Sequence, residues 1–350
     1  MNHKYVGADV HSASTTFNVR DKIGKTLMEA TVPTRAKEIV SFVKGLDGTI
    51  HLTFEEGAQA AWLHEVVRPY VAELVVCDPR KNKLLEHGSK SDRVDAARLS
   101  ELLRGRLLTP VYHGETPTRQ LKELVRAYDR LVRDSVRTMN HVKAVFRSRA
   151  IPAIGAEVFE LERRDAWLKK LPFDGLRRRV SWALTQLDLV TRLRGEAEHA
   201  MLAEARKHGA SRPLSTIPGI GPIRAAQIIG TVGTPHRFRT KRQFWSYVGL
   251  AVVTRSSADY RVDAGQLTRK TRCSTRGLNR NHCPFLKSIF KGAALDAIRS
   301  GLREYHDAML KRGMRPEMAR LTVARKIAAI TLTLWKKGER YDPQLLTPTS

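Results

Sequence analysis

Three short apolar runs, separated by turn-forming residues, open the chain and constrain its fold more than any other feature. The runs cover residues 4–10, 14–20 and 26–32, and His11-Ser12-Ala13 and Asp21-Lys22-Ile23-Gly24 lie between them. Runs of this length bounded by such turns predict β-strands. We then expect a helix over 35–45, a strand over 49–55, a helix over 58–71, a strand over 73–77 and helices from about residue 80. This order predicts a mixed α/β domain.

Four acidic residues occupy defined places in that order of elements. Three meander strands followed by alternating helices and strands are the pattern of an RNase H-like domain, in which the first and fourth strands are neighbours. Asp9 ends the first predicted strand and Glu55 ends the fourth, while Asp92 and Asp95 begin a helical pattern and share one helix face. Such carboxylates can hold hard divalent cations for phosphodiester chemistry. Glu56 competes with Glu55, but Glu55 continues the strand alternation.

The charge of the chain is divided unevenly along its 350 residues. Residues 1–95 hold 13 basic and 13 acidic side chains, so the rest of the chain carries the whole formal net charge of +27. A neutral head joined to a basic body indicates a catalytic domain attached to a nucleic-acid-binding one, the alternative being a merely soluble basic protein. The three cysteines form no CxxC pair and are too few for a disulfide framework or a zinc cluster.

Residues 118–208 have helical periodicity almost throughout. Breaks are expected at 151–155 and 171–175, which contain proline and glycine. Two long helices joined by a shorter one fit an antiparallel coiled-coil spacer or dimerisation arm, and equally a plain helical bundle packed on the head. Residues 284–336 are also predicted to be helical, with a turn between Gly313 and Pro316.

A glycine- and proline-containing turn at 218–221, flanked by helical segments, resembles a helix-hairpin-helix element. Gly219 and Gly221 would let backbone N–H groups approach a phosphate, although a turn that joins two packed helices needs no ligand. Residues 255–291 follow with nine basic residues against two acids. A solvated loop is the usual interpretation of such a run, but its guanidinium and hydroxyl groups also suit phosphate contacts. The candidate nucleic-acid-binding residues are Lys90, Arg93, Gly219, Gly221, Arg255, Arg261, Arg269, Lys270, Arg272, Arg276 and Arg280.

These motifs together resemble the DEDD-type insertion-sequence transposases, the family that includes the Piv-type DNA invertases and the bridge-RNA-guided recombinases. The resemblance is carried at the N-terminus by residues 6–10, 53–57 and 90–96, and further on by residues 217–221, 244–250, 255–257 and 276–279. It extends over nearly the whole chain. No single motif is decisive, but their order and spacing are specific.

The resemblance implies three regions and a composite active site. A RuvC-like catalytic domain (1–112) would hold Mg²⁺ or Mn²⁺ through the four acids, followed by a coiled-coil region (113–209) and a mostly helical transposase domain (210–350). That last domain would supply a serine that attacks DNA and forms a transient phosphoserine link. Ser257 fits the family spacing best and Ser256 is the alternative, since Ala258 replaces the glycine that usually follows. The family implies a dimer to tetramer around donor DNA, target DNA and a structured guide RNA.

From the residues alone, neither serine has a local His/Asp relay, so a phosphate-contacting or turn role is favoured for both. Two other functions therefore stay open: a Holliday-junction-type nuclease that uses metal-activated water, and a non-enzymatic nucleic-acid-binding scaffold. No run approaches 18 apolar residues and the N-terminus does not have the pattern of a signal peptide. We expect a cytoplasmic, nucleoid-associated protein without membrane contact.

Overall fold

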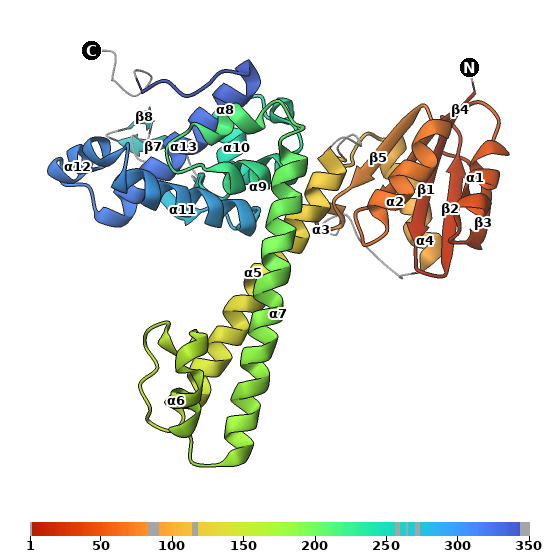
Figure 1. The fold of residues 1–350 in the computed structure, drawn as a ribbon. Helices are drawn as coiled ribbons and strands as arrows, with labels where there is room; N and C mark the ends of the chain where they lie inside the picture. The colour runs from red at the N-terminus through yellow and green to blue at the C-terminus, as the bar shows by residue number, and fades with distance from the viewer. Residues whose placement is uncertain are drawn as a thin grey trace. The chain divides into compact units, whose positions relative to one another are not determined.

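A computed structural model describes residues 2–82, 91–113, 118–255, 260–263, 265–269 and 274–343. The chain divides into two compact units, residues 1–113 and 114–350 (Figure 1). The helical region predicted over 113–209 thus falls almost wholly within the second unit, together with residues 210–350. The predicted boundary near residue 210 stays a prediction.

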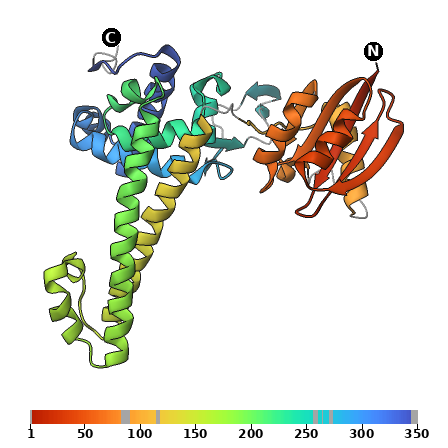
Figure 2. The same cartoon turned by 45° about the vertical axis from the view of Figure 1, so that its right-hand side comes forward.

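The first unit is built on a five-stranded mixed sheet (Figure 2). Its strands are β1 (His3–Val10), β2 (Ser14–Arg20), β3 (Thr26–Pro33), β4 (Thr49–Glu55) and β5 (Glu73–Cys77). The spatial order is β3-β2-β1-β4-β5, in which β1 to β3 form an antiparallel meander and β4 runs parallel to β1. The predicted contact between the first and fourth strands is therefore confirmed, and the mixed α/β architecture is compatible with an RNase H-like domain.

The two faces of this sheet are covered by different helices. Val6 and Ala8 of β1, with Leu52 and Phe54 of β4, belong to one buried cluster with α1 (Ala36–Lys44) and α2 (Ala60–Val67). The intervening residues of each strand point to the other face because strand side chains alternate. That face is packed by α4 (Asp92–Arg104), which contacts β1, β2 and β4.

Helix α2 is shorter than the sequence predicted. It ends at Val67, and the 3-10 turn η1 (Arg68–Tyr70) replaces its expected last turn. Pro69 lies within that turn and has no N–H group to continue the α-helical bonding. The short helix α3 (Pro79–Asn82) follows β5.

Two long antiparallel helices form an arm in the second unit, as predicted. They are α5 (Arg119–Arg147) and α7 (Asp174–Ala205), and they lie side by side in Figures 1 and 2. At the tip, η4 (Glu157–Phe159), η5 (Leu161–Arg163) and α6 (Arg164–Lys169) close a small separate core around Phe146. At the base, Leu121, Val125 and Met201 enter the main core of the unit. The arm is therefore rooted in the core of this unit, and its role as a spacer or dimerisation arm stays a prediction.

The remainder of the second unit is mostly helical around one apolar core that includes Ile229, Phe290 and Ile327. Gly313, with φ +80°, lies in the predicted turn before the last long helix. Within the described residues, no helix combines the length and apolarity needed to cross a bilayer. The helices are α8 (Ser211–Ser215), α9 (Pro222–Val232), η6 (Pro235–Arg237), α10 (Lys241–Tyr247), α11 (Pro284–Arg299), α12 (Arg303–Lys311) and α13 (Pro316–Lys337).

Two antiparallel ribbons lie in the basic segment, for which the sequence suggested either a solvated loop or phosphate contacts. Strand β6 (Val252–Arg255) pairs with β9 (Ser274–Leu278), and β7 (Tyr260–Asp263) pairs with β8 (Gln266–Arg269). Gly265 lies between β7 and β8 with φ +81°, which a hairpin turn of this length requires. The sequence did not predict these strands because the high arginine and threonine content concealed short alternating runs such as 260–262.

Candidate metal centre

Asp9 and Glu55 lie on the same face and at the same edge of the sheet. Their strands are parallel neighbours, with Ala8 opposite Phe54, and each acid follows a residue whose side chain lies in the core on the other face. Alternation therefore directs both carboxylates to the side covered by α4. The parallel pairing, read from the sequence, was sufficient to bring these two acids together.

Helix α4 contributes the other two acids from its first turn. The helix begins after Ser91, whose hydroxyl oxygen accepts a hydrogen bond from the Val94 N–H at 3.3 Å. This N-cap fixes the start of the helix and so places Asp92 and Asp95 at its N-terminal end. All four predicted acids line a single cavity of about 480 Å³.

The close approach of α4 to the sheet depends on Gly7 of β1. A Cβ atom at this position would lie 2.2 Å from the Ala96 carbonyl oxygen and 2.4 Å from the Ser100 nitrogen, both of them backbone atoms of α4. Any side chain here would force the helix away from the strand that carries Asp9. Gly7 thus sets the distance between the acids on β1 and those on α4.

A buried network of hydrogen bonds holds α4 against the sheet. The Ser100 hydroxyl donates to the Asn18 side-chain oxygen at 2.7 Å and accepts from Arg20 Nε at 3.1 Å. Asn18 and Ser100 are both fully buried, so these bonds cannot be replaced by water. The network ties the helix to β2 in one position.

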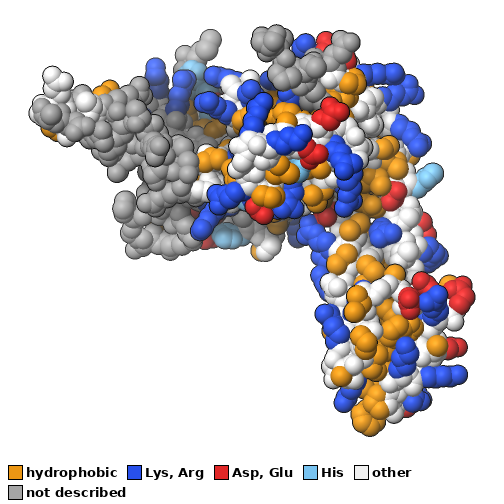
Figure 3. Space-filling view, turned by 90° about the vertical axis from the view of Figure 1, so that its left-hand side faces the viewer, with side chains coloured by type: hydrophobic (Ala, Val, Ile, Leu, Met, Phe, Trp, Pro, Cys, Tyr) orange, Lys and Arg blue, Asp and Glu red, His pale blue; other side chains and the backbone are white. Residues whose placement is uncertain are grey.

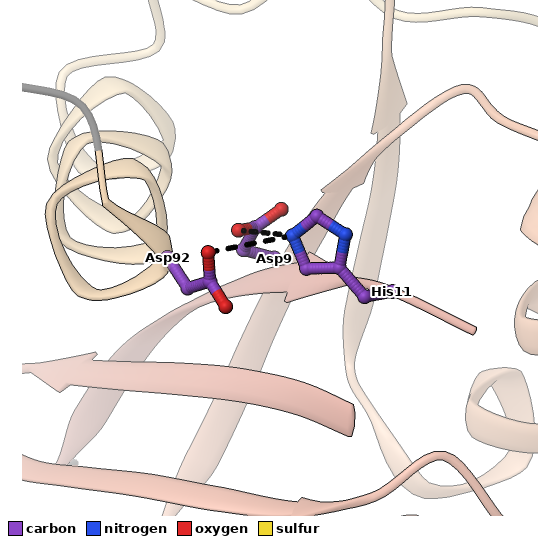
Figure 4. Close-up of side chains that lie close together, drawn as sticks. All are labelled: Asp9, His11 and Asp92. Atoms are coloured by element: carbon purple, nitrogen blue, oxygen red, sulfur yellow. Dashed lines mark hydrogen bonds and ion pairs between the residues drawn. The ribbon is translucent and has the colours of Figure 1, made fainter. Parts of the chain in front are cut away.

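His11 completes the cluster, although the sequence suggested only a turn residue. Its Nε2 atom lies 3.2 Å from Asp9 Oδ2 and 3.5 Å from Asp92 Oδ1, and the ring points between the two carboxylates (Figure 4). One ligand atom from each of these three residues lies within 4.8 Å of the others. The sequence did not reveal this contact because His11 follows the end of the first strand, where the alternation of strand side chains no longer fixes the direction of a side chain.

The acids differ in their electrostatic surroundings. Burial raises the pKa of Asp9, the charges of Asp92 and Asp95 raise it further, and His11 opposes the shift. Asp95 is paired with Arg98 at 3.4 Å. Close carboxylates of this kind repel one another and gain stability from a bound cation.

Glu56, the competitor of Glu55, makes different contacts. Its carboxylate lies 2.5 Å from His113 Nε2, and its backbone N–H donates to the Cys77 carbonyl as β4 ends. Glu55 is the last residue of β4 and is paired in register with Cys77. This arrangement supports the choice of Glu55 as the ligand.

The donor set fits a divalent metal ion. The four predicted acids line one cavity together with the His11 imidazole and with Glu56, whose carboxylate is bonded to His113. Oxygen-rich sites of this kind suit Mg²⁺ or Mn²⁺. The cavity also borders open solvent through exposed groups such as Asp92, so a phosphate could reach a bound ion. Holding a divalent ion beside a phosphodiester is the chemistry that this arrangement permits.

The predicted nucleic-acid contacts are distributed over both units. Arg93 is exposed in the first turn of α4, and Arg280 is exposed after β9. Arg255, Arg261, Arg269 and Arg276 lie within the strands of the two ribbons. Lys90, Lys270 and Arg272 lie outside the described residues, as do Ser256 and Ser257, so the serine assignment stays a prediction.

Helix packing explains the glycine at position 219, which the sequence predicted to lie in a helix-hairpin-helix element. Its φ is +77°, and a Cβ atom there would lie 2.1 Å from the Ala293 carbonyl oxygen of α11. Arg224 bonds the Gly219 carbonyl at 2.6 Å and Asp296 at 2.6 Å. These contacts account for Gly219 without a ligand, whereas nothing lies within 4 Å of a Cβ atom at Gly221.

A second cavity, of about 810 Å³, lies between the β6–β9 ribbon and helices α11 and α13. Apolar side chains such as Leu278 and Met318 line it, and Lys287, Lys291 and Arg315 add positive charge. Figure 3 shows one face of the second unit with Lys and Arg side chains spread across it. This surface is suited to a polyanion.

Comparison with known proteins gives matches in both units. A DEDD transposase model of the IS110 type matches residues 6–149, and a model described as the transposase IS116/IS110/IS902 family matches residues 211–309. A Sinorhizobium fredii protein named as a transposase, y4pF/y4sB, is 23% identical over 87% of this chain and 77% of its own length. The transposase for insertion sequence element IS1111A of Coxiella burnetii is 26% identical over 53% of this chain and 52% of its own length. A Streptomyces coelicolor insertion element IS110 protein is 30% identical over 43% of this chain and 34% of its own.

Proposed function

The chain belongs to the IS110 family of DNA transposases, and on that premise we propose that it cuts and rejoins insertion-sequence DNA through a transient phosphoserine link. The observation that carries this proposal is the convergence of Asp9, Glu55, Asp92 and Asp95 on one cavity. Acids drawn from two neighbouring strands and a helix would hold Mg²⁺ or Mn²⁺ there, and DEDD transposases use a divalent metal.

The proposed reaction exchanges one phosphate ester bond for another. The Oγ atom of Ser257, or of Ser256 as the alternative, attacks a DNA phosphorus and forms the Ser–O–P bond. The P–O bond to a deoxyribose oxygen breaks, and that sugar leaves as a hydroxyl after taking a proton. A divalent cation at the acids would lower the pKa of the attacking hydroxyl and offset the charge on the phosphate. The reverse attack by a new sugar hydroxyl rejoins DNA without loss of bond energy.

We propose that the acids and the serine of one active site come from different subunits, in a dimer or tetramer. Trp182, Leu189 and Leu193 support an oligomer because they form an exposed apolar stripe along α7, at helical spacing. Apolar side chains also follow the arm in Figure 3. An exposed stripe of this kind gains stability by packing against a second arm.

Donor DNA, target DNA and a structured guide RNA are the proposed partners. The charge of +27 supports binding to polyanions of either type. Copurified RNA, sequenced after nuclease protection, would identify a guide whose loops match the ends of the element and its target. Protein purified free of RNA that still rearranges DNA at a defined target would refute the guided part of the proposal.

The serine mechanism is tested by trapping the covalent link. A suicide DNA substrate with a nicked strand should yield a protein–DNA adduct with the wild type, and the adduct should map to a peptide containing residue 256 or 257. Ser257→Ala should abolish it if Ser257 is the nucleophile, while Ser256→Ala should retain it. Strand cleavage that persists in the double variant would favour a metal-dependent nuclease that uses water.

The catalytic role of the acids needs a separate test. Asp9→Ala combined with Glu55→Ala should abolish both the adduct and strand transfer, and binding to DNA should remain because the basic residues are unchanged. Complete rearrangement by that double variant would refute any catalytic role for the acids. A wild-type protein that binds DNA but forms no adduct and transfers no strand would instead support the nucleic-acid-binding scaffold.

A further inference from the structure

The His11 side chain lies where a metal ligand would lie, beside the four predicted acids. The His11 side chain is 56% exposed, and among the described residues its ring has polar contacts only with the carboxylates of Asp9 and Asp92. Its Nε2 atom is the atom that faces both of them (Figure 4). A histidine held only for packing would have its ring covered by apolar groups.

The backbone holds His11 in this position from both sides. The His11 N–H donates to the Ser14 carbonyl at 2.9 Å, and the His11 carbonyl accepts from the Thr34 hydroxyl at 2.8 Å. The Thr34 hydroxyl oxygen in turn accepts a hydrogen bond from the Thr15 hydroxyl at 2.9 Å. The turn between β1 and β2 therefore presents the ring to the site at little further entropic cost.

The distances agree with neighbouring ligands around one ion. Two ligand atoms about 2.1 Å from a metal and at right angles to each other lie about 3.0 Å apart. The observed separations are 3.2 Å to Asp9 and 3.5 Å to Asp92. Small side-chain adjustments would bring all three groups to one ion.

We propose that the imidazole of His11 is a ligand of the divalent cation, which gives a mixed nitrogen and oxygen donor set that selects Mn²⁺ or Co²⁺ over Mg²⁺. Imidazole binds transition metals well, whereas Mg²⁺ prefers oxygen and retains its water. The inference rests on the proposed function, because it takes the acids as the metal site, and it adds the identity of the fifth donor and of the preferred ion.

The test uses the full chain and Mn²⁺ as the probe. Electron spin echo modulation of bound Mn²⁺ should show coupling to a ¹⁴N nucleus in the wild type and lose it in His11→Ala. The same substitution should weaken Mn²⁺ and Co²⁺ binding by at least about tenfold and change Mg²⁺ binding much less. His113→Ala is the matched control, since His113 also bonds a carboxylate at this end of the sheet and should leave the nitrogen coupling intact.

The outcomes separate this inference from the function on which it rests. Mn²⁺ binding without nitrogen coupling, unchanged in His11→Ala and abolished by Asp9→Ala, would overturn the histidine ligand and leave the acidic metal site standing. Equal losses of Mg²⁺ and Mn²⁺ affinity in His11→Ala would also overturn the selectivity. No binding of any divalent ion by the wild type would refute the proposed metal site itself.

Discussion

Replacing Gly7 with alanine should disable the metal centre without touching any of its ligands. The new Cβ would lie 2.2 Å from the Ala96 carbonyl oxygen, where ordinary contact begins at 3.4 Å. The two nearest atoms of α4 are backbone atoms and the third, at 3.0 Å, is the Leu99 Cβ, so no side-chain rotation relieves the clash. Helix α4 must therefore withdraw by about 1.2 Å, and Asp92 and Asp95 must move with it while Asp9 stays on β1.

A shift of this size is several times the tolerance of a metal site, which is about 0.2 Å in ligand distance. We expect Mn²⁺ affinity to fall by about 10- to 100-fold and strand transfer by about 100-fold. The cost in unfolding free energy should be about 1–3 kcal/mol, as for other overpacked sites. Mn²⁺ titration followed by electron paramagnetic resonance measures the affinity, and thermal unfolding in EDTA measures the stability.

The matched control is Gly57→Ala in the same unit, where no atom lies within 4 Å of the added Cβ. It should leave the melting temperature in EDTA unchanged. If Gly7→Ala folds and binds Mn²⁺ as tightly as the wild type, then the approach of α4 does not determine the site, and the geometric account given for Gly7 is wrong.

Four further variants, one of them a double substitution, test individual contacts. In EDTA, Asp9→Asn should raise the melting temperature at pH 7. The raised pKa of Asp9 makes the wild-type protein lose stability as the pH rises from 3.8, the ordinary pKa of aspartate, through the raised pKa. The difference between the two proteins should therefore disappear below pH 3.8. Ser100→Ala should cost about 1–3 kcal/mol of unfolding free energy because it leaves a buried Asn18 oxygen without its donor, and exposed Ser181→Ala should cost nothing measurable. Trp182→Glu combined with Leu189→Glu should lower the molecular mass measured by light scattering, while the melting temperature stays constant. An unchanged mass would argue against an interface between arms. Gly219→Ala should lower the melting temperature because its Cβ clashes with Ala293, whereas Gly221→Ala should leave it unchanged. A loss of DNA affinity in Gly221→Ala alone would support a phosphate contact at this hairpin.

The positions of Asp9 and Glu55 could be predicted because they follow from local rules. Strand alternation fixes the face of each side chain, and the order of elements fixes which strands are neighbours. The start of α4 was also visible, since Ser91 is a good N-cap and stands directly before the two acids. Each of these inferences needs only short-range information.

His11 and the two ribbons could not be predicted in this way. His11 stands in the turn after β1, where strand alternation no longer fixes the direction of a side chain, so its contact with Asp92 did not follow from the order of elements. In the ribbons, arginine and threonine occupy positions that alternate with Tyr260 and Val262. Strand pairing there depends on the partner strand, which composition does not reveal.

The four acids and Gly7 contribute different things to the metal centre. The acids set the chemistry, but the depth at which α4 crosses β1 sets the separation between them, and that depth is permitted by the missing Cβ atom at Gly7. Ser100 and Asn18 then hold the helix at the depth that Gly7 allows. A chain with all four acids and a larger residue at position 7 would therefore keep the motif and lose the geometry. The motif alone is a weaker sign of metal binding than the motif with a glycine two residues before its first aspartate.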